Sequence, residues 1–165
     1  MSAPVHSTFS SPATVEQVFG VLTSPEWVGT KAERFSDDSE LVQREEREDG
    51  GVLLTVSRKL PDGVPGFLQK FLPHDGRVVE TFDWGPARPD GTRHGEWKAD
   101  IQGAPARLGG AMRLDPTEVG SAYTIEGDVK VKVPLLGGRA ESYIAEMVGK
   151  LAAKEADLLR DTLGL

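Results

Sequence analysis

Alternating apolar and polar side chains predict an antiparallel sheet through most of the chain. Val5 and Phe9 alternate with polar residues, which indicates an opening strand. Six further runs with strand character lie between residues 39 and 133, and turns rich in Gly, Pro and Asp separate most of them. Short connections of this kind are typical of an antiparallel meander. The six runs are 40–48, 51–60, 76–85, 92–102, 106–115 and 120–133.

Helical spacing of apolar residues appears directly after the opening strand and at the end of the chain. A short helix is predicted to about Thr23, with Ser11 able to cap it and Pro12 at its first position. A second short helix is predicted over 25–34. A long apolar stripe with a 3.6-residue period predicts a helix over about 139–163. At 1.5 Å per residue this helix would be roughly 37 Å long, so we expect it to lie across the sheet.

An apolar segment at 64–73, the flap, interrupts the predicted meander. Its apolar residues follow helical spacing, and Pro and Gly surround them. Exposing each large apolar side chain would cost roughly 1.5–3 kcal/mol, so the flap must close over something. It can be a lid on a cavity, a transient membrane contact, a protein interface or a plain core-capping helix. Its large side chains are Phe67, Leu68, Phe71 and Leu72.

Composition excludes several classes of protein. A length of 165 residues suits a single domain over 1–165. There are no cysteines, and the three histidines occur singly at His6, His74 and His94, so no metal site and no cofactor are predicted. The net charge of -7 argues against nucleic acid as a partner. Without a long apolar run or a signal peptide, we expect no transmembrane segment and a cytoplasmic location.

The order of these elements resembles the helix-grip fold of the START-like superfamily, also called the polyketide cyclase/dehydrase and lipid transport superfamily. The resemblance rests on the opening strand with Pro12 and Phe19, on Pro25-Glu26-Trp27, and on the passage from Val129 into the last helix. More narrowly, the chain resembles a bacterial family of unknown function, domain of unknown function 2505. The resemblance implies an α+β fold, in which a curved antiparallel sheet of about seven strands grips the long C-terminal helix. It also implies an apolar cavity between them.

Several residues are candidates for that cavity, and each has a plainer structural interpretation. Glu155 interrupts the apolar stripe of the last helix, so it is either a polar anchor for a ligand or the partner of a sheet arginine. Glu80 can face a ligand or pair with Arg93 or Lys98, and Arg58 can bind a carboxylate or reach solvent. The remaining candidates are apolar or aromatic side chains that can line the cavity or belong to an ordinary core: Phe82, Trp84, Trp97, Tyr123, Ile144, Met147 and Leu151.

The leading hypothesis is a non-enzymatic protein, monomer or homodimer, that binds or carries a hydrophobic small molecule or lipid. In this hypothesis the flap controls entry and Glu155 orients the ligand. The first alternative is an aromatase/cyclase-type enzyme in which Glu80 and Glu155 move protons on a bound polyketide. The second alternative is a protein-interaction module that uses the flap. No catalytic residue is assigned.

Overall fold

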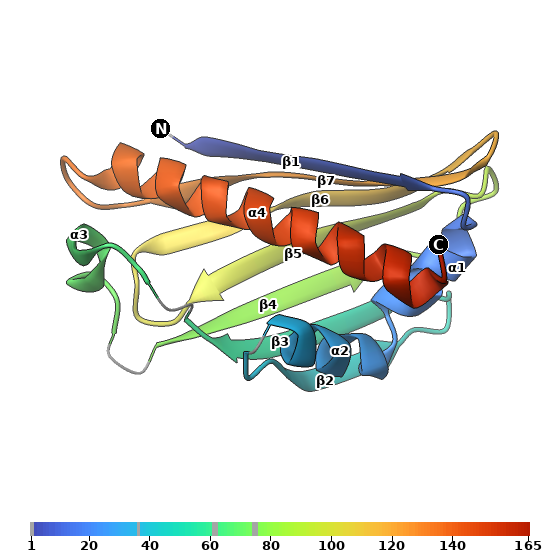
Figure 1. Cartoon of the computed structure of the whole chain (residues 1–165), viewed down its shortest axis with the longest axis horizontal. Helices are drawn as coiled ribbons and strands as arrows, with labels where there is room; N and C mark the ends of the chain where they lie inside the picture. The colour runs from blue at the N-terminus through green and yellow to red at the C-terminus, as the bar shows by residue number, and fades with distance from the viewer. Residues whose placement is uncertain (1, 36, 61–62, 74–75) are drawn as a thin grey trace.

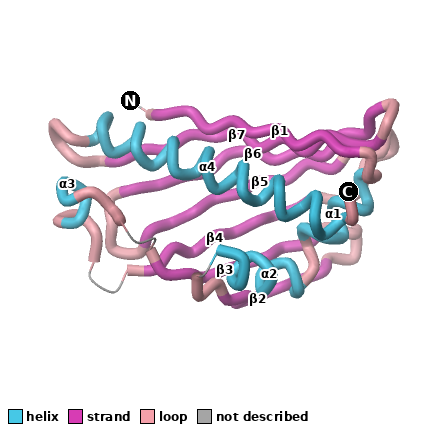
Figure 2. Tube along the Cα trace, viewed as in Figure 1, coloured by secondary structure: helices cyan, strands magenta, loops and turns pink. Residues whose placement is uncertain are grey.

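A curved seven-stranded antiparallel sheet wraps around one side of a long helix (Figures 1 and 2). The computed structural model describes residues 2–35, 37–60, 63–73 and 76–165; His74 lies outside them. The strands are β1 (Ala3–Ser11), β2 (Glu40–Glu46), β3 (Val52–Lys59), β4 (Arg77–Trp84), β5 (Arg93–Ile101), β6 (Ala106–Thr117) and β7 (Gly120–Val131), and the helices are α1 (Val15–Leu22), α2 (Pro25–Phe35), α3 (Gly66–Gln69) and α4 (Gly137–Leu163).

The sheet has the order β1-β7-β6-β5-β4-β3-β2, so all neighbours except β1 and β7 are consecutive in the chain. The opening strand pairs with the last one, with Ala3 opposite Val129 and Phe9 opposite Tyr123. The predicted α+β helix-grip architecture is confirmed, and each predicted strand run contains or overlaps an observed strand.

The start of α1 differs from the prediction. Ser11 is still part of β1, and its Oγ accepts a hydrogen bond from the Ala13 N–H at 3.2 Å. The helix is instead capped by Thr14 and Gln17, whose side chains each accept a hydrogen bond from the other residue's backbone N–H. A capping box satisfies two N–H groups at once, so it places the helix start three residues later than a lone serine cap would.

The long helix α4 crosses the concave side of the sheet and packs on β1 and β7, while α1 packs against its C-terminal half (Figure 1). The buried carboxylate of Glu141 accepts a hydrogen bond from the Val131 N–H at 2.9 Å, which connects the N-terminal part of α4 to the end of β7. At the other end, Gly164 adopts a left-handed conformation with φ 76° and ends the helix.

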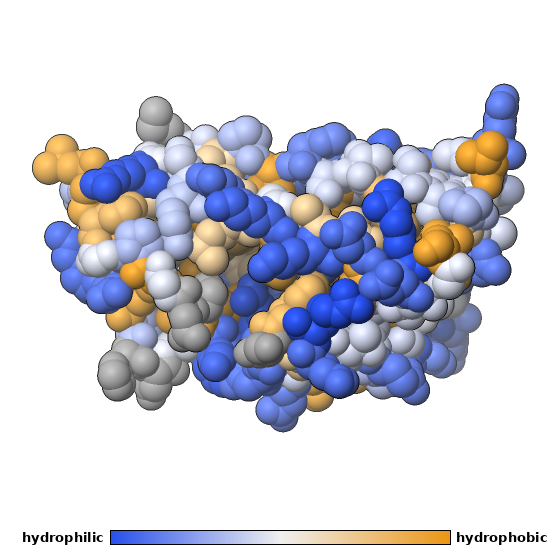
Figure 3. Space-filling view, viewed as in Figure 1, coloured by the Kyte–Doolittle hydropathy of each residue, from blue (hydrophilic) through white to orange (hydrophobic). Residues whose placement is uncertain are grey.

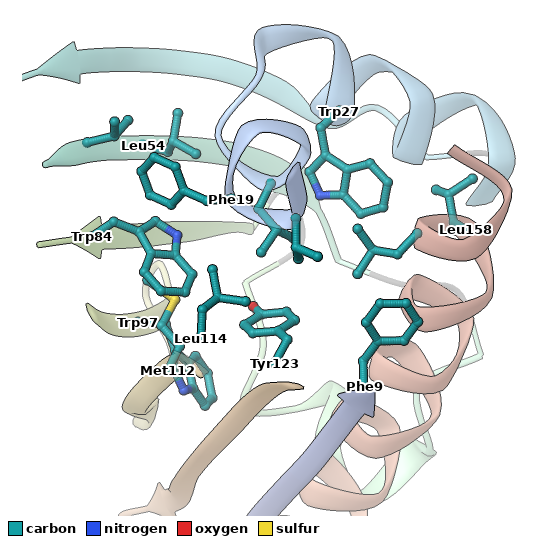
Figure 4. Close-up of a cluster of buried hydrophobic side chains, with 14 of the residues drawn as sticks. Phe9, Phe19, Trp27, Leu54, Trp84, Trp97, Met112, Leu114, Tyr123 and Leu158 are labelled. Atoms are coloured by element: carbon teal, nitrogen blue, oxygen red, sulfur yellow. The ribbon is translucent and has the colours of Figure 1, made fainter. Parts of the chain in front are cut away.

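The apolar interior is tightly packed at the end of the sheet near α1 (Figure 4). Trp84 is its centre: its ring meets Phe19 edge-on at 5.8 Å and Tyr123 at 6.1 Å. Helices α1 and α2 contribute Phe19 and Trp27, and the C-terminal part of α4 contributes Leu158. We call this region the packed half of the interior.

Trp97 fits into the packed half because two glycines lie opposite it in the sheet. Its cross-strand neighbour on β6 is Gly110, which in turn pairs with Gly127 on β7. A Cβ at Gly127 would lie 2.8 Å from the Trp97 ring and 2.3 Å from the Gly109 carbonyl oxygen. The indole N–H then donates to the Glu126 carbonyl at 3.0 Å, so the ring is buried with its polar atom satisfied.

Candidate ligand cavity

A cavity of about 390 Å³ occupies the other half of the interior, between the N-terminal half of α4, the sheet and the flap. In the space-filling view, a hollow with paler, less hydrophilic side chains lies beside the hydrophilic outer face of α4 (Figure 3). The helix contributes seven side chains to its wall: Tyr143, Ile144, Met147, Val148, Lys150, Leu151 and Lys154.

Small side chains on part of the sheet contribute to this hollow, although larger apolar residues of the sheet also line it. Ala99 and Ala106 line the cavity on β5 and β6, and Ala104 lines it in the turn between these strands. In the packed half, the inward positions of the same sheet carry Trp84 and Trp97. A straight helix cannot follow a curved sheet along its whole length, and alanines do not fill the space that remains.

The flap closes one end of the cavity. Leu68 is buried, and Leu68, Phe71 and Leu72 all line the wall. Phe67 does not line the cavity. Its ring centroid lies 4.0 Å from the guanidinium carbon of Arg139, in the first part of α4. This cation–π contact joins the flap to the helix it faces.

Four charged side chains form two ion pairs between the cavity and the packed half. Lys31 Nζ lies 3.2 Å from Glu155 Oε1, and Arg58 Nε donates to Glu80 Oε1 at 3.0 Å. All four side chains are less than a quarter exposed. Burial by itself lowers the pKa of Lys31, but the nearby carboxylates of Glu155 and Glu80 outweigh it and raise the pKa. Lys31 therefore carries a charge within a largely apolar setting.

The partners of these acids differ from those considered from the sequence, although Glu80 does form a cross-strand pair. Glu155 pairs with a lysine of α2 rather than with an arginine of the sheet, and Glu80 pairs with Arg58 on the neighbouring strand. Arg93, the partner considered for Glu80, binds Glu16 at 2.7 Å instead. Arg58 also lines the cavity, so it does not simply extend into solvent.

The predicted cavity residues divide between the two halves of the interior. Leu68, Phe71, Leu72, Ile144, Met147 and Leu151 line the cavity. The other candidates do not line this cavity. Trp84, Trp97 and Tyr123 belong to the packed half, where burial, and secondarily the Glu155 charge, raises the pKa of the tyrosine. Phe82 packs against the core and lies 5.8 Å from Lys31 Nζ. Phe67, Glu80 and Glu155 have the contacts described above.

Sequence reasoning missed several residues of the cavity wall. Tyr143 shares the apolar stripe of α4, and Ala99 alternates with the exposed residues Lys98 and Asp100 on β5. The small size of inward residues such as Ala99 was therefore an available signal for a hollow. Phe35, Lys150 and Lys154 also line the cavity, and no local pattern marked them.

Within the residues that the structure describes, no three His, Cys, Asp or Glu side chains are grouped so that they could hold a metal ion. Across the same residues, no helix combines the length and apolar character needed to cross a membrane.

Comparisons with known proteins agree with this architecture. The sequence profile of a family described as "Protein of unknown function (DUF2505)" matches residues 6–163. A search of curated protein sequences found no significant match.

Solved structures share the fold at low sequence identity. A protein of Thermus thermophilus has a TM-score of 0.63 and 15% identity, covering 98% of this chain and 97% of that one. The Zhui aromatase/cyclase of Streptomyces sp. R1128 has a TM-score of 0.56 and 14% identity, covering 99% and 91%. A STAR-related lipid transfer protein of Xanthomonas axonopodis has a TM-score of 0.56 and 16% identity, covering 97% and 84%. At these identities the likeness concerns the fold alone.

Proposed function

This chain belongs to the DUF2505 family and has a START-like helix-grip fold, and we propose that it binds or carries a hydrophobic small molecule or lipid in the cavity beneath α4. We expect this activity in the cytoplasm, as a monomer or homodimer. In this proposal the flap is a lid that opens to admit the ligand to the cavity.

The observation that carries this proposal is the unequal filling of the two halves of the interior. One half is packed with Trp84, Phe19 and Tyr123, whereas the other leaves about 390 Å³ behind an apolar wall. Ligand pockets typically have about 300–1,000 Å³ and mostly apolar walls. An empty apolar cavity of this size would cost stability, because its wall atoms lack contacts that a ligand would supply.

The enzyme alternative has weaker support. It requires Glu80 and Glu155 to converge on a bound polyketide. Each acid is engaged in an ion pair, and neither lines the cavity. The lipid transfer protein and the aromatase/cyclase have the same fold, so the fold does not choose between these activities.

Binding of a neutral lipophilic dye such as Nile red, together with native mass spectrometry of the freshly purified protein, tests the proposal. We expect saturable dye binding, or a copurified ligand that the dye displaces. Met147→Trp fills the cavity from α4 and should abolish dye binding, whereas Val119→Trp adds the same side chain at an exposed turn and should not. Absence of both saturable dye binding and an extractable ligand in the wild-type protein would overturn the proposal.

The remaining interpretations of the flap can be tested separately. Leu68→Ser/Phe71→Ser removes two apolar side chains that face the cavity. A lid predicts faster dye release with an unchanged oligomeric state. An interface predicts that a wild-type dimer becomes a monomer in size-exclusion chromatography, and a membrane contact predicts loss of binding to lipid vesicles.

A further inference from the structure

The charged side chains around the cavity are mostly basic, whereas the chain as a whole has a negative net charge. The chain carries 26 acidic and 19 basic side chains, for a net charge of -7. Among the described residues that line the cavity, four are basic and one, Asp37, is acidic. The basic residues are Arg58, Lys59, Lys150 and Lys154. A local excess of positive charge in an acidic protein is a feature of the cavity that the apolar wall does not explain.

The basic side chains reach the cavity from two elements that face each other. Lys150 and Lys154 are four residues apart on α4, so they lie on one face of the helix, a turn apart. Arg58 and Lys59 come from the end of β3, next to the cavity wall residue Leu60. Like charges that converge from two elements repel, and an anion between them removes that cost.

The carboxylates nearby compensate this charge only in part. Glu80 accepts a hydrogen bond from Arg58 at 3.0 Å, and Glu146 lies 3.4 Å from Lys150 in a pair exposed on both sides. An exposed pair of this kind contributes little and is easily exchanged for another partner. Asp37 accepts a hydrogen bond from the Ser39 N–H at 2.8 Å. Asp38 lies beside Lys59: it accepts a hydrogen bond from the Lys59 N–H at 2.6 Å, and it also forms an ion pair with Arg77 at 2.8 Å. Asp38 therefore offsets part of the Lys59 charge, and Lys154 adds positive charge at the cavity beyond what these acids offset.

We propose that the ligand is an anionic amphiphile, with an apolar tail in the cavity beneath α4 and an anionic head group held by Lys150, Lys154 and the Arg58–Lys59 end of β3. This inference rests on the proposed function and adds the chemical class of the ligand. A carboxylate or a phosphate monoester supplies the same charge and the same hydrogen-bond acceptors. Long lysine side chains suit either head group, because their ammonium groups act as adjustable point charges.

Competition with bound Nile red tests the head group while the tail stays constant. The probes are decanoic acid, decyl phosphate, decanol and decyltrimethylammonium, each below its micelle concentration. We expect at least one anion to bind about tenfold more tightly than decanol, and the cation to bind weakest. Added salt should weaken the binding of the anion but not that of decanol. The anion that binds more tightly identifies the head group as a carboxylate or a phosphate.

Two double variants that remove the same charge distinguish direct binding of the head group by cavity lysines from a general electrostatic effect of the protein's net charge. Lys150→Gln/Lys154→Gln should weaken binding of the preferred anion by about tenfold and change decanol binding by less than about twofold. Lys98→Gln/Lys130→Gln removes the same charge from exposed positions that alternate with inward residues of β5 and β7, and should change neither.

The outcomes separate this inference from the proposed function. Three results would overturn the inference of an anionic head group: equal affinity for anion and alcohol, tighter binding of the cation, or an equal effect of the two double variants. Each of them would leave a protein that binds hydrophobic molecules in general. Nile red binding that none of the four probes displaces would also overturn it. Failure of Nile red itself to bind, with no copurified ligand, would instead overturn the proposed function.

Discussion

Lys31 of α2 and Glu155 of α4 form an ion pair at 3.2 Å, although 124 positions separate them in the chain. Their side chains are 11% and 23% exposed, and the rings of Trp27 and Phe82 lie within 6 Å of the lysine Nζ. The pair joins the second short helix to the long one at the boundary between the packed half and the cavity. It therefore links the two parts of the chain that cover the concave face of the sheet.

We expect Lys31→Met to lower the free energy of unfolding by about 2–3 kcal/mol, because it leaves the Glu155 carboxylate largely buried without a partner. The double variant Lys31→Met/Glu155→Leu should recover most of this loss, since both charges are then replaced by apolar groups. Urea unfolding measures both values. Lys130→Met, at an exposed position of β7, is the control and should change stability by less than about 0.5 kcal/mol. A double variant no more stable than the single one would contradict this account.

The ion pair between Glu16 and Arg93 predicts an acid-dependent loss of stability. Arg93 donates to both carboxylate oxygens, at 2.7 and 2.8 Å, and these hydrogen bonds hold the pKa of Glu16 below its ordinary value of 4.5, against a smaller opposing effect of burial. The folded-state pKa is lower than the unfolded-state one. The pair therefore stabilises the fold above about pH 4.5, and this contribution is lost as pH falls through the folded-state pKa.

Glu16→Gln should accordingly be less stable than the wild type at neutral pH, and the difference should shrink as pH falls from about 4.5 through the lowered folded-state pKa of Glu16. Because the Glu16 side chain is 60% exposed, solvent screening limits the difference to about 1 kcal/mol or less. Urea unfolding across this pH range measures it, with Glu118→Gln in an exposed turn as the control. A difference that stays constant with pH would count against the ion pair.

Two glycine-to-alanine substitutions should have opposite effects. Gly127→Ala places a Cβ 2.3 Å from the Gly109 carbonyl oxygen and 2.8 Å from the Trp97 ring, so we expect a loss of about 2 kcal/mol. Gly149→Ala meets no atom within 4 Å in the middle of α4, so we expect a gain of about 0.5–1 kcal/mol. Thermal unfolding of the two variants measures the signs. A neutral Gly127→Ala would show that β6 and β7 are not as close as described.

The two halves of the interior should respond differently to loss of a leucine side chain. Leu158 is 2% exposed in the packed half, so Leu158→Ala should cost about 3–4 kcal/mol by leaving a new void. Leu151 lines an existing cavity, so Leu151→Ala in the ligand-free protein should cost about 1–2 kcal/mol. Urea unfolding of both variants tests the difference, and equal losses would indicate that the cavity half is as tightly packed as the other.

The sequence by itself determined the order of the strands and helices and, where the alternation is clear, which face of a strand is buried. Alternation with a period of two follows directly from the geometry of a strand, and the 3.6-residue stripe does the same for α4. These local patterns, with the order of the elements, carried the resemblance to the helix-grip fold, and that resemblance implied an apolar cavity beneath the long helix. They also identified the flap and the three α4 residues Ile144, Met147 and Leu151 that line the cavity.

Only the tertiary structure decided where along each strand the interior is filled. Trp84 and Val78 share one face of β4, yet Trp84 lies in the packed half and Val78 lines the cavity. Alternation does not indicate whether an inward side chain lies in the packed half or at the cavity. That difference depends on which helix covers each end of the sheet. The charged partners were undetermined for the same reason: Lys31 meets Glu155 only because α2 and α4 are brought together over the curved sheet, and no local pattern encodes a contact across 124 positions.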